Sequence, residues 1–191
     1  MLSVSAIVVF VLAVTVLFGV RSVQQIRATG NSGWRFPSRA KDRNQWAARI
    51  LMGPGGFAVG LAAPVADLAG LPGFGIADAT WPRVTGLVIA VAATLATFAV
   101  QQTMGASWRI GVEKTERTAL VNSGAFGFVR NPIFTGLIAL VTGLTLAVPN
   151  LIAVIGLFAV VAGVELLVRR VEEPYLLATH GDGYRDYAAG T

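Results

Sequence analysis

Residues 120–136 read Leu-Val-Asn-Ser-Gly-Ala-Phe-Gly-Phe-Val-Arg-Asn-Pro-Ile-Phe-Thr-Gly, and this stretch leads from a charged connection into an apolar helix. Asn131 is a favourable helix N-cap, and Pro132 suits the first helical position because a free N–H is not needed there. A helix start presents unpaired N–H groups and the positive end of the helix dipole, which favour an anion. Arg130 adds a cation beside it. We therefore predict an anion-binding site at residues 130–132.

The composition places this site at the surface of a membrane. Of the 191 residues, 54% are hydrophobic and only 13% are charged, whereas a soluble domain has about 25% charged residues. The mean hydropathy is +0.67. The net charge of +5 does not indicate nucleic-acid binding, because the basic residues gather in short connections between apolar segments. The chain has no cysteine, which excludes disulfides, thiolate metal sites and cysteine nucleophiles.

Five apolar segments predict an all-α, polytopic membrane bundle with about five transmembrane helices. They cover residues 2–20, 47–71, 84–104, 133–148 and 151–168. Pro54 lies inside the second segment and should kink or break its helix. The last two segments are joined by Pro149-Asn150, which predicts a C-terminal helical hairpin followed by a cytoplasmic tail. We expect one domain, 1–191, in which residues 1–103 form N-terminal spans and 104–191 the binding and catalytic region.

The charges of the connections predict the orientation. Basic residues concentrate in the first and third connections and in the tail, whereas the opposite side has only Arg83, with Asp67 and Asp78 nearby. The positive-inside rule then places the N-terminus outside and the C-terminus in the cytoplasm. We expect an integral protein of a plasma membrane, the inner membrane of a bacterium.

Acidic residues near the end of the last segment are candidates for chemistry. Glu165, Arg169 and Glu172 are spaced i, i+4 and i+7, which predicts that they share one helix face. Glu165 would then be either a functional intramembrane acid or the partner of Arg169 in an ion pair. Glu172 and Glu173 are expected at a helix end, where carboxylates oppose the dipole unless a bound cation compensates them. The alternative is a solvated helix end.

The remaining polar residues carry weaker signals. His180 is the only histidine, so we expect a hydrogen-bonding residue of the tail, with a place in the catalytic site as the alternative and no metal site. Tyr175, Tyr184 and Tyr187 are either interface anchors or pocket walls. Trp108 lies among polar residues and could line a site, whereas the other tryptophans are typical of an aromatic belt. Small residues in the last two segments, including Gly136, indicate close helix packing.

In this region the chain resembles the isoprenylcysteine carboxyl methyltransferase family, which is itself similar to the phospholipid methyltransferases. The family pattern Leu-Val-x-x-Gly-x-Tyr is matched by residues 120–126, and Arg-His-Pro-x-Tyr-x-Gly by residues 130–136. A hairpin, Glu172-Glu173 and the Gly181-Asp182-Gly183-Tyr184 tail follow. The chain departs from the pattern at three positions, with Phe126 and Phe134 where Tyr is frequent and Asn131 where His is frequent. The resemblance covers residues 104–187.

The resemblance implies an integral membrane methyltransferase that uses S-adenosylmethionine. By position, the resemblance assigns the cofactor site to Gly124, Phe126, Arg130, Asn131, Pro132, Glu172, Glu173 and Tyr184. It implies methyl transfer to a lipophilic acceptor, isoprenoid or lipid-like, at the cytoplasmic membrane face. A carboxylate acceptor needs no base, whereas other acceptors would call for Glu165, with Arg169 beside it, or His180.

Two other functions fit the same segments. One is another lipid-modifying or redox membrane enzyme of this fold. The other is a non-catalytic membrane bundle or a small transporter. A transporter should place its polar groups near the middle of the membrane at a repeat interface, whereas here they gather at one face, which favours the enzyme.

Overall fold

The computed structural model describes residues 1–34, 42–75, 79–111 and 120–191. In these ranges the regular elements are helices. They are α1 (Leu2–Val14), α2 (Arg21–Thr29), α3 (Arg43–Phe57), α4 (Ala63–Leu68), α5 (Thr80–Thr103), α6 (Pro132–Ala147), α7 (Leu151–Leu167), α8 (Glu173–His180) and α9 (Asp182–Gly190). Three π-helical segments, η1 (Thr15–Val20), η2 (Ala58–Ala62) and η6 (Val168–Glu172), join some of them end to end, and two 3-10 turns, η4 (Gly105–Ser107) and η5 (Gly124–Gly127), lie in the connections.

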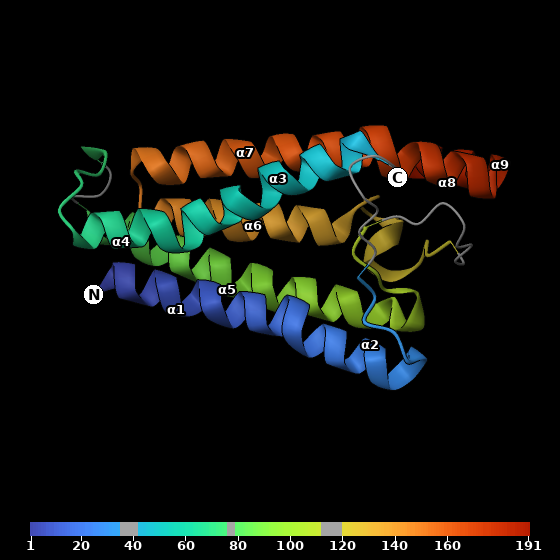
Figure 1. The fold of residues 1–191 in the computed structure, drawn as a ribbon, viewed down its shortest axis with the longest axis horizontal. Coiled ribbons are helices and arrows are strands. Elements are labelled where there is room, and N and C mark those ends of the chain that lie inside the picture. The colour runs from blue at the N-terminus through green and yellow to red at the C-terminus, as the bar shows by residue number, and fades with distance from the viewer. Residues whose placement is uncertain (35–41, 76–78, 112–119) are drawn as a thin grey trace.

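The joined helices make four long rods and one shorter one, which confirms the predicted all-α membrane bundle. Leu2–Thr29, Arg43–Leu68, Thr80–Thr103 and Leu151–His180 are each long and apolar enough to cross a membrane, and Pro132–Ala147 is a shorter apolar helix. Figure 1 shows the rods lying side by side along the longest axis, with the two chain ends at opposite ends of the bundle. The protein is an integral membrane protein.

Glycines set how closely the helices approach. A Cβ on Gly86 of α5 would lie 2.4 Å from the carbonyl oxygen of Gly143 in α6. A Cβ on Gly55 of α3 would likewise lie 2.9 Å from the carbonyl oxygen of Gly156 in α7. Small residues let backbones meet where lipid supplies no hydrophobic drive for association. As a result the two helices of the hairpin have different main partners: α6 packs along α5, and α7 packs along α3.

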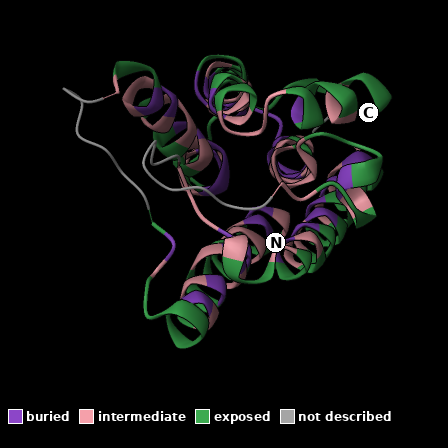
Figure 2. Ribbon diagram, turned by 90° about the vertical axis from the view of Figure 1, so that its right-hand side faces the viewer, coloured by how far each residue is buried: buried purple, intermediate pink, exposed green. Residues whose placement is uncertain are grey.

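Side chains are buried where these helices pack together and exposed on their outer sides. The larger core cluster draws on α1, α5, α6 and α7, with Leu17, Leu144 and Val148 fully enclosed. Large apolar side chains such as Leu95 and Phe158 remain exposed, as expected for the lipid-facing sides of membrane helices. Figure 2 shows exposed residues over the outer surfaces of the bundle and buried ones toward its inside.

The end of the bundle that contains the N-terminus is held by one polar cluster. Arg83 of α5 lies 3.4 Å from the Asp67 carboxylate of α4 and donates from Nε to the carbonyl oxygen of Ala147 at 2.8 Å. Ser3 of α1 donates to the same Asp67 carboxylate and accepts from Arg83 at 3.2 Å. We call this set the Arg83 clamp. It connects α1, α4 and α5 to the end of α6.

Two expected boundaries need correction. The first helix does not end near Val20 but continues through η1 and α2 to Thr29. The second is not broken at Pro54, since α3 runs through this proline and continues through η2 to Leu68. A proline inside a membrane helix is tolerated where neighbouring helices compensate for it, and the next residue, Gly55, packs closely against Gly156 of α7.

The helix of the last segment also continues beyond the expected end. It runs from α7 through η6 into α8 and ends at His180, and Pro174 takes a place in the first turn of α8. Glu172 and Glu173 are therefore inside a continuous helix. The expectation that both acids stand at a helix C-terminus was wrong, so the dipole argument for a bound cation does not apply to them.

Candidate functional site

One continuous cavity of about 830 Å³ connects the charged end of the bundle with its apolar interior. Its polar part is lined by side chains from the connection before α6 and from η6 and α8, namely Arg109, Arg130, Asn131, Glu172 and Tyr175. Its apolar part extends between α1, α3, α6 and α7, past Phe10, Leu61, Leu140 and Val160. A single space thus meets both ionic groups and hydrocarbon side chains.

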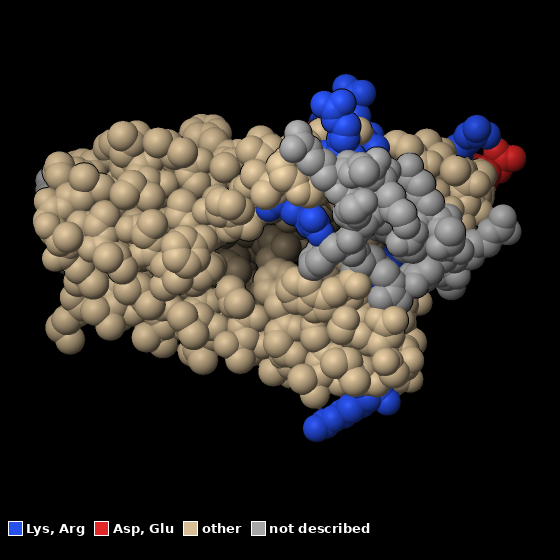
Figure 3. Space-filling view, in the orientation of Figure 1, with Lys and Arg blue, Asp and Glu red and all other residues tan. Residues whose placement is uncertain are grey.

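The apolar part opens sideways between α1 and α3. Val11 and Val14 of α1 and Phe57 of α3 line the cavity and are also 48%, 40% and 58% exposed. Gly53 and Gly56 line it too, and a Cβ on either would meet nothing within 4 Å. We call this opening the α1–α3 mouth. Figure 3 shows a hollow on this face of the molecule, with basic side-chain atoms at its edge.

Arg130 and Asn131 bring the start of α6 to the cavity. Arg130 Nη1 lies 3.7 Å from Glu173 Oε1, with both side chains partly exposed. Asn131 occupies the N-cap position and Pro132 begins the helix, as predicted, but the Asn131 side chain makes no capping hydrogen bond among the described residues. Its backbone carbonyl accepts from the N–H of Thr135 at 3.0 Å. The Asn131 amide therefore lines the cavity without serving the helix start.

Glu172 and Arg109 bring opposite charges to the same wall. The π-helical segment η6 turns Glu172 toward the cavity, where Arg109 acts on it electrostatically. The Arg109 guanidinium lies over the ring of Tyr175, 5.3 Å from its centroid, a distance at which a cation is attracted to the ring face. Tyr175 itself is only 8% exposed. The wall thus contains a half-buried carboxylate and, within its electrostatic influence, a cation that lies over an aromatic ring.

The C-terminal helix α9 closes over this region. The Tyr187 hydroxyl donates to the backbone carbonyl of Phe126 at 2.7 Å, and the rings of Tyr184 and Tyr187 lie 6.0 Å apart. Burial, and after it the negative charge of Glu173, raises the pKa of Tyr184, and burial raises the pKa of Tyr187. Both phenols therefore stay protonated at neutral pH, so Tyr187 can keep its donor role.

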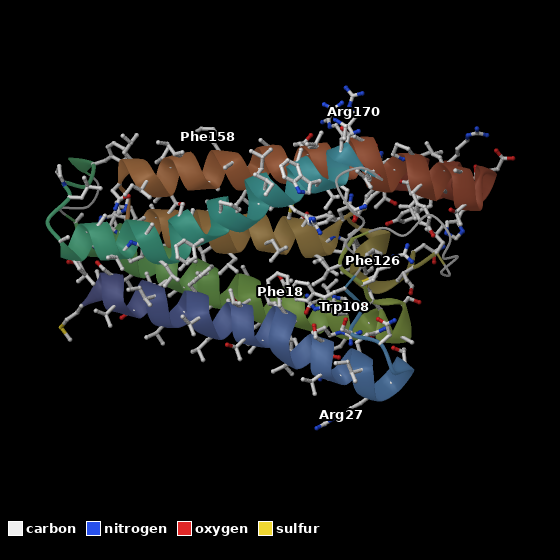
Figure 4. The ribbon with its side chains drawn as sticks, in the orientation of Figure 1. Phe18, Arg27, Trp108, Phe126, Phe158 and Arg170 are labelled. Carbon is white, nitrogen blue, oxygen red and sulfur yellow. The ribbon has the colours of Figure 1, made fainter. Side chains whose placement is uncertain are left out.

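Residues of α2 hold Trp108 in place. It is 2% exposed, and the Arg21 guanidinium lies 4.8 Å from its ring centroid. Arg21 also donates to the carbonyl oxygen of Gly105, and Gln25 donates to that of Ala106 at 2.8 Å. Figure 4 shows Trp108 near Phe18 and Phe126, whereas Arg27 projects outward from α2. Trp108 lines the cavity, which fits the place considered for it from the sequence.

The structure sorts the residues predicted for the site into three groups. Phe126, Arg130, Asn131 and Glu172 line the cavity. The second group borders it without lining it among the described residues: Gly124 opens η5, Pro132 opens α6, Glu173 pairs with Arg130, and Tyr184 packs beside Tyr187. The third group, Glu165, Arg169 and His180, is absent from the described cavity wall.

Glu165 and Arg169 pair with each other on the outer surface. Arg169 Nε lies 2.5 Å from Glu165 Oε2, and the two side chains are 73% and 55% exposed. The expectation that they share a helix face with Glu172 was wrong, because a π-helical turn holds more residues than an α-helical turn and shifts the register between Arg169 and Glu172. The alternative considered from the sequence, a local Glu165–Arg169 ion pair, is what the structure contains.

Sequence reasoning missed several residues of the cavity wall, among them Gln45, Arg49, Gln101 and Arg109. Gln45, Arg49, Met52 and Gly56 recur at helical spacing on α3, so a helix-face analysis of residues 43–57 could have found the first two. Nothing in the sequence indicates that Arg109 meets Glu172, because their proximity depends on the tertiary packing of η6.

Comparison with known proteins agrees with this geometry. The family model described as phospholipid methyltransferase matches residues 81–183, which is more than half of the 191-residue chain. No curated protein and no solved structure matched. The matched residues include Arg109, Arg130, Asn131, Glu172 and Tyr175, which line the polar part of the cavity. The chain belongs to the phospholipid methyltransferase family of membrane enzymes.

Proposed function

We propose that this protein transfers a methyl group from S-adenosylmethionine to a lipophilic acceptor, within the cavity and at the cytoplasmic face of the membrane. One observation carries the proposal. The cavity that holds the ionic groups Arg130 and Glu172 is continuous with the lipid-exposed α1–α3 mouth. A water-soluble donor and a membrane-embedded acceptor could therefore share one space.

The cavity wall has the chemistry that this donor requires. The α-carboxylate of S-adenosylmethionine would be bound by Arg130 and by the free N–H groups at the start of α6. Its α-ammonium would be bound by Glu172 rather than Glu173, because Glu173 is paired with Arg130 outside the cavity. The rings of Phe126, Tyr175 and Trp108 offer apolar and cation-attracting faces. The donor would supply an electrophilic methyl group on a sulfonium.

The protein's own contribution would be alignment and exclusion of water. In-line displacement gains much of its acceleration from holding two reactants in the attacking geometry. The Tyr187–Phe126 hydrogen bond and the Arg21–Trp108 contact fix two walls of the polar part. Glu165 and His180 are outside the described wall, so we propose neither as a base. A carboxylate acceptor would need none.

The orientation is part of the proposal. The cavity's polar part lies at the end of the bundle that also carries Arg21, Arg27, Arg169 and Arg170, whereas Arg83 lies at the other end. The positive-inside rule assigns the first end to the cytoplasm. A reporter fused after Thr191 should be cytoplasmic, and one inserted at Leu71 should be outside. A reporter site at Asp78 would lie beyond the described residues. A cytoplasmic signal at Leu71 would overturn the orientation.

Calorimetric titration of S-adenosylmethionine into the purified full-length protein tests the proposed donor. Saturable binding is expected, with Arg130→Ala and Glu172→Gln weakening it. The alternative is a non-catalytic bundle or a small transporter. If the parent protein, folded and in detergent or vesicles, shows no donor binding, the methyltransferase proposal fails for this chain and that alternative gains.

A further inference from the structure

The C-terminal helix α9 lies between the polar part of the cavity and water. Its residues Tyr184 and Tyr187 are three positions apart and face inward, since Tyr184 is 4% exposed and Tyr187 lines the cavity. The charged residues of the same helix, Asp182, Arg185 and Asp186, are exposed. One side of α9 therefore belongs to the cavity and the other to the aqueous surface, whereas the α1–α3 mouth is bordered by apolar side chains.

A hydrogen bond of Tyr187 ties α9 to the connection before α6. Its hydroxyl donates to the backbone carbonyl of Phe126 in η5 at 2.7 Å. In the described part of the chain, the other side-chain hydrogen bonds of this segment stay within it: Arg185 donates to Asp182, and Thr191 donates to the Tyr187 carbonyl. One hydrogen bond contributes modestly to stability, so this tie can break without unfolding the bundle.

Gly181 joins α9 to α8 with a backbone conformation that needs glycine. Its φ is 55° and its ψ is −125°, a combination outside the left-handed helical region that other residues can reach. A Cβ on Gly181 would meet nothing within 4 Å, so the backbone conformation and not the available space requires glycine. The chain turns sharply here, and α9 folds back against α8 (Figure 1). Residues at the ends of helices commonly serve as hinges.

We propose that α9 is a lid over the polar part of the cavity, with Gly181 as its hinge and the Tyr187–Phe126 hydrogen bond as its latch. It opens to admit S-adenosylmethionine and to release the demethylated product. The donor is charged, so passage through the apolar α1–α3 mouth would remove its hydration at a large cost. Opening of α9 gives it a direct route from water, while the acceptor enters from lipid. The identity of this ligand rests on the proposed function, but the movement of α9 does not.

Rates of donor binding to the full-length protein in detergent test the latch. They are measured by stopped flow through tryptophan fluorescence, since Trp34 and Trp108 line the cavity. A lid that is mostly closed with and without ligand limits both entry and exit. Tyr187→Phe removes only the latch hydroxyl, so it should raise the association and dissociation rate constants together by roughly two- to tenfold, the range for one hydrogen bond, with Kd nearly unchanged. A tyrosine that only contacts bound donor would alter dissociation alone.

Two glycines test the hinge. Gly181→Ala penalises the closed backbone conformation, so it should raise both rate constants as Tyr187→Phe does. Gly183→Ala is the matched control, because Gly183 lies within α9, has no positive φ and has equally open space around its Cβ. It should leave both rate constants at the parent values. An unchanged association rate constant in both Tyr187→Phe and Gly181→Ala would overturn the lid.

The reactivity of a single thiol tests the lid without any ligand. Ala188 lies one helical turn beyond Tyr184 and is partly buried, whereas Ala189 is exposed. The chain has no cysteine, so Ala188→Cys and Ala189→Cys each carry one thiol. Alkylation of Ala188→Cys by a water-soluble maleimide should be accelerated when Tyr187→Phe is added, by the same factor as the donor rates, and that of Ala189→Cys should not change. Equal rates for Ala188→Cys with and without the latch would overturn the lid. Absence of donor binding by calorimetry would instead overturn the proposed function.

Discussion

Arg130 and Glu173 form an ion pair, with Nη1 and Oε1 3.7 Å apart, although 43 positions separate them in the chain. The contact joins the loop before α6 to the first turn of α8. The adjacent Glu172 instead lines the cavity. Two acids adjacent in the sequence therefore have different surroundings, because consecutive residues of a helix point in different directions. Glu173 holds Arg130 at the edge, and we propose that Glu172 serves the ligand.

Replacing Arg130 should weaken donor binding. Arg130→Ala removes the cation next to the start of α6, and we expect a loss of at least about 1 kcal/mol in binding free energy, the low end for a charge-assisted hydrogen bond. Calorimetric titration with S-adenosylmethionine measures it. Arg185→Ala, which removes an exposed arginine paired with Asp182 in α9, is the matched control. Unchanged affinity in a folded Arg130→Ala protein would remove Arg130 from the site.

The two acids should respond differently to the same substitution. Glu172→Gln and Glu173→Gln are nearly isosteric, so each removes charge and spares packing. Because Glu172 faces the cavity and Glu173 faces Arg130, Glu172→Gln should reduce donor affinity by about tenfold or more, and Glu173→Gln by clearly less. The titration used for Arg130 gives both values. Equal effects, or a larger one for Glu173, would reverse the assignment of the ammonium site.

Filling the α1–α3 mouth should block the acceptor and spare the donor. Gly53 and Gly56 line the cavity, and a Cβ there meets nothing within 4 Å, so the Cβ of Gly56→Leu has room and the rest of its side chain adds bulk to the mouth. Leucine also favours a helix over glycine by roughly 1 kcal/mol, so loss of folding is not expected. Methyl transfer to a long-chain acceptor should fall at least about tenfold, a barrier increase of roughly 1.4 kcal/mol, with donor affinity unchanged.

Gly19→Leu provides the comparison for the mouth. Gly19 is exposed, has equally open space around its Cβ and is not part of the described cavity wall. This variant should retain transfer. If Gly19→Leu and Gly56→Leu lose activity equally, or if neither does, the acceptor does not pass through this opening.

The Arg83 clamp should matter for stability and not for ligand binding. Arg83→Gln removes the ion pair with Asp67 and the hydrogen bond to Ala147, both only partly exposed. We expect a loss of about 1–3 kcal/mol, the cost of leaving buried polar groups unpaired, seen as a lower thermal midpoint in detergent. Arg27→Gln, at an exposed position of α2, should leave the midpoint unchanged. A lower donor affinity in folded Arg83→Gln protein would contradict a purely structural role.

The membrane spans and the start of α6 could be predicted from the sequence, because both depend on local signals. Continuous apolar runs define membrane helices, and the order Arg130-Asn131-Pro132 defines a helix start. The positions at which the long helices end depend instead on tertiary packing. Pro54 is accommodated because α3 packs against α7 at Gly55 and Gly156, a contact between residues far apart in sequence.

The candidate site was found only in part, for a related reason. A uniform helical period placed Glu165, Arg169 and Glu172 on one face, but the π-helical segment η6 breaks that period, and no residue type in Val168–Glu172 signals it. Arg109 and Arg49 reach the cavity through the packing of separate helices. Local patterns cannot reveal such contacts, whereas the motif around Arg130 could be read directly.

Transfer of a labelled methyl group into lipid tests the central claim most directly. Purified full-length protein in vesicles is incubated with methyl-labelled S-adenosylmethionine and an apolar membrane extract, and the label that partitions into the organic phase is counted. We predict organic-phase label that accumulates with time and is greatly reduced in both Glu172→Gln and Gly56→Leu. The absence of organic-phase label from folded, donor-binding protein with the complete extract would contradict the account.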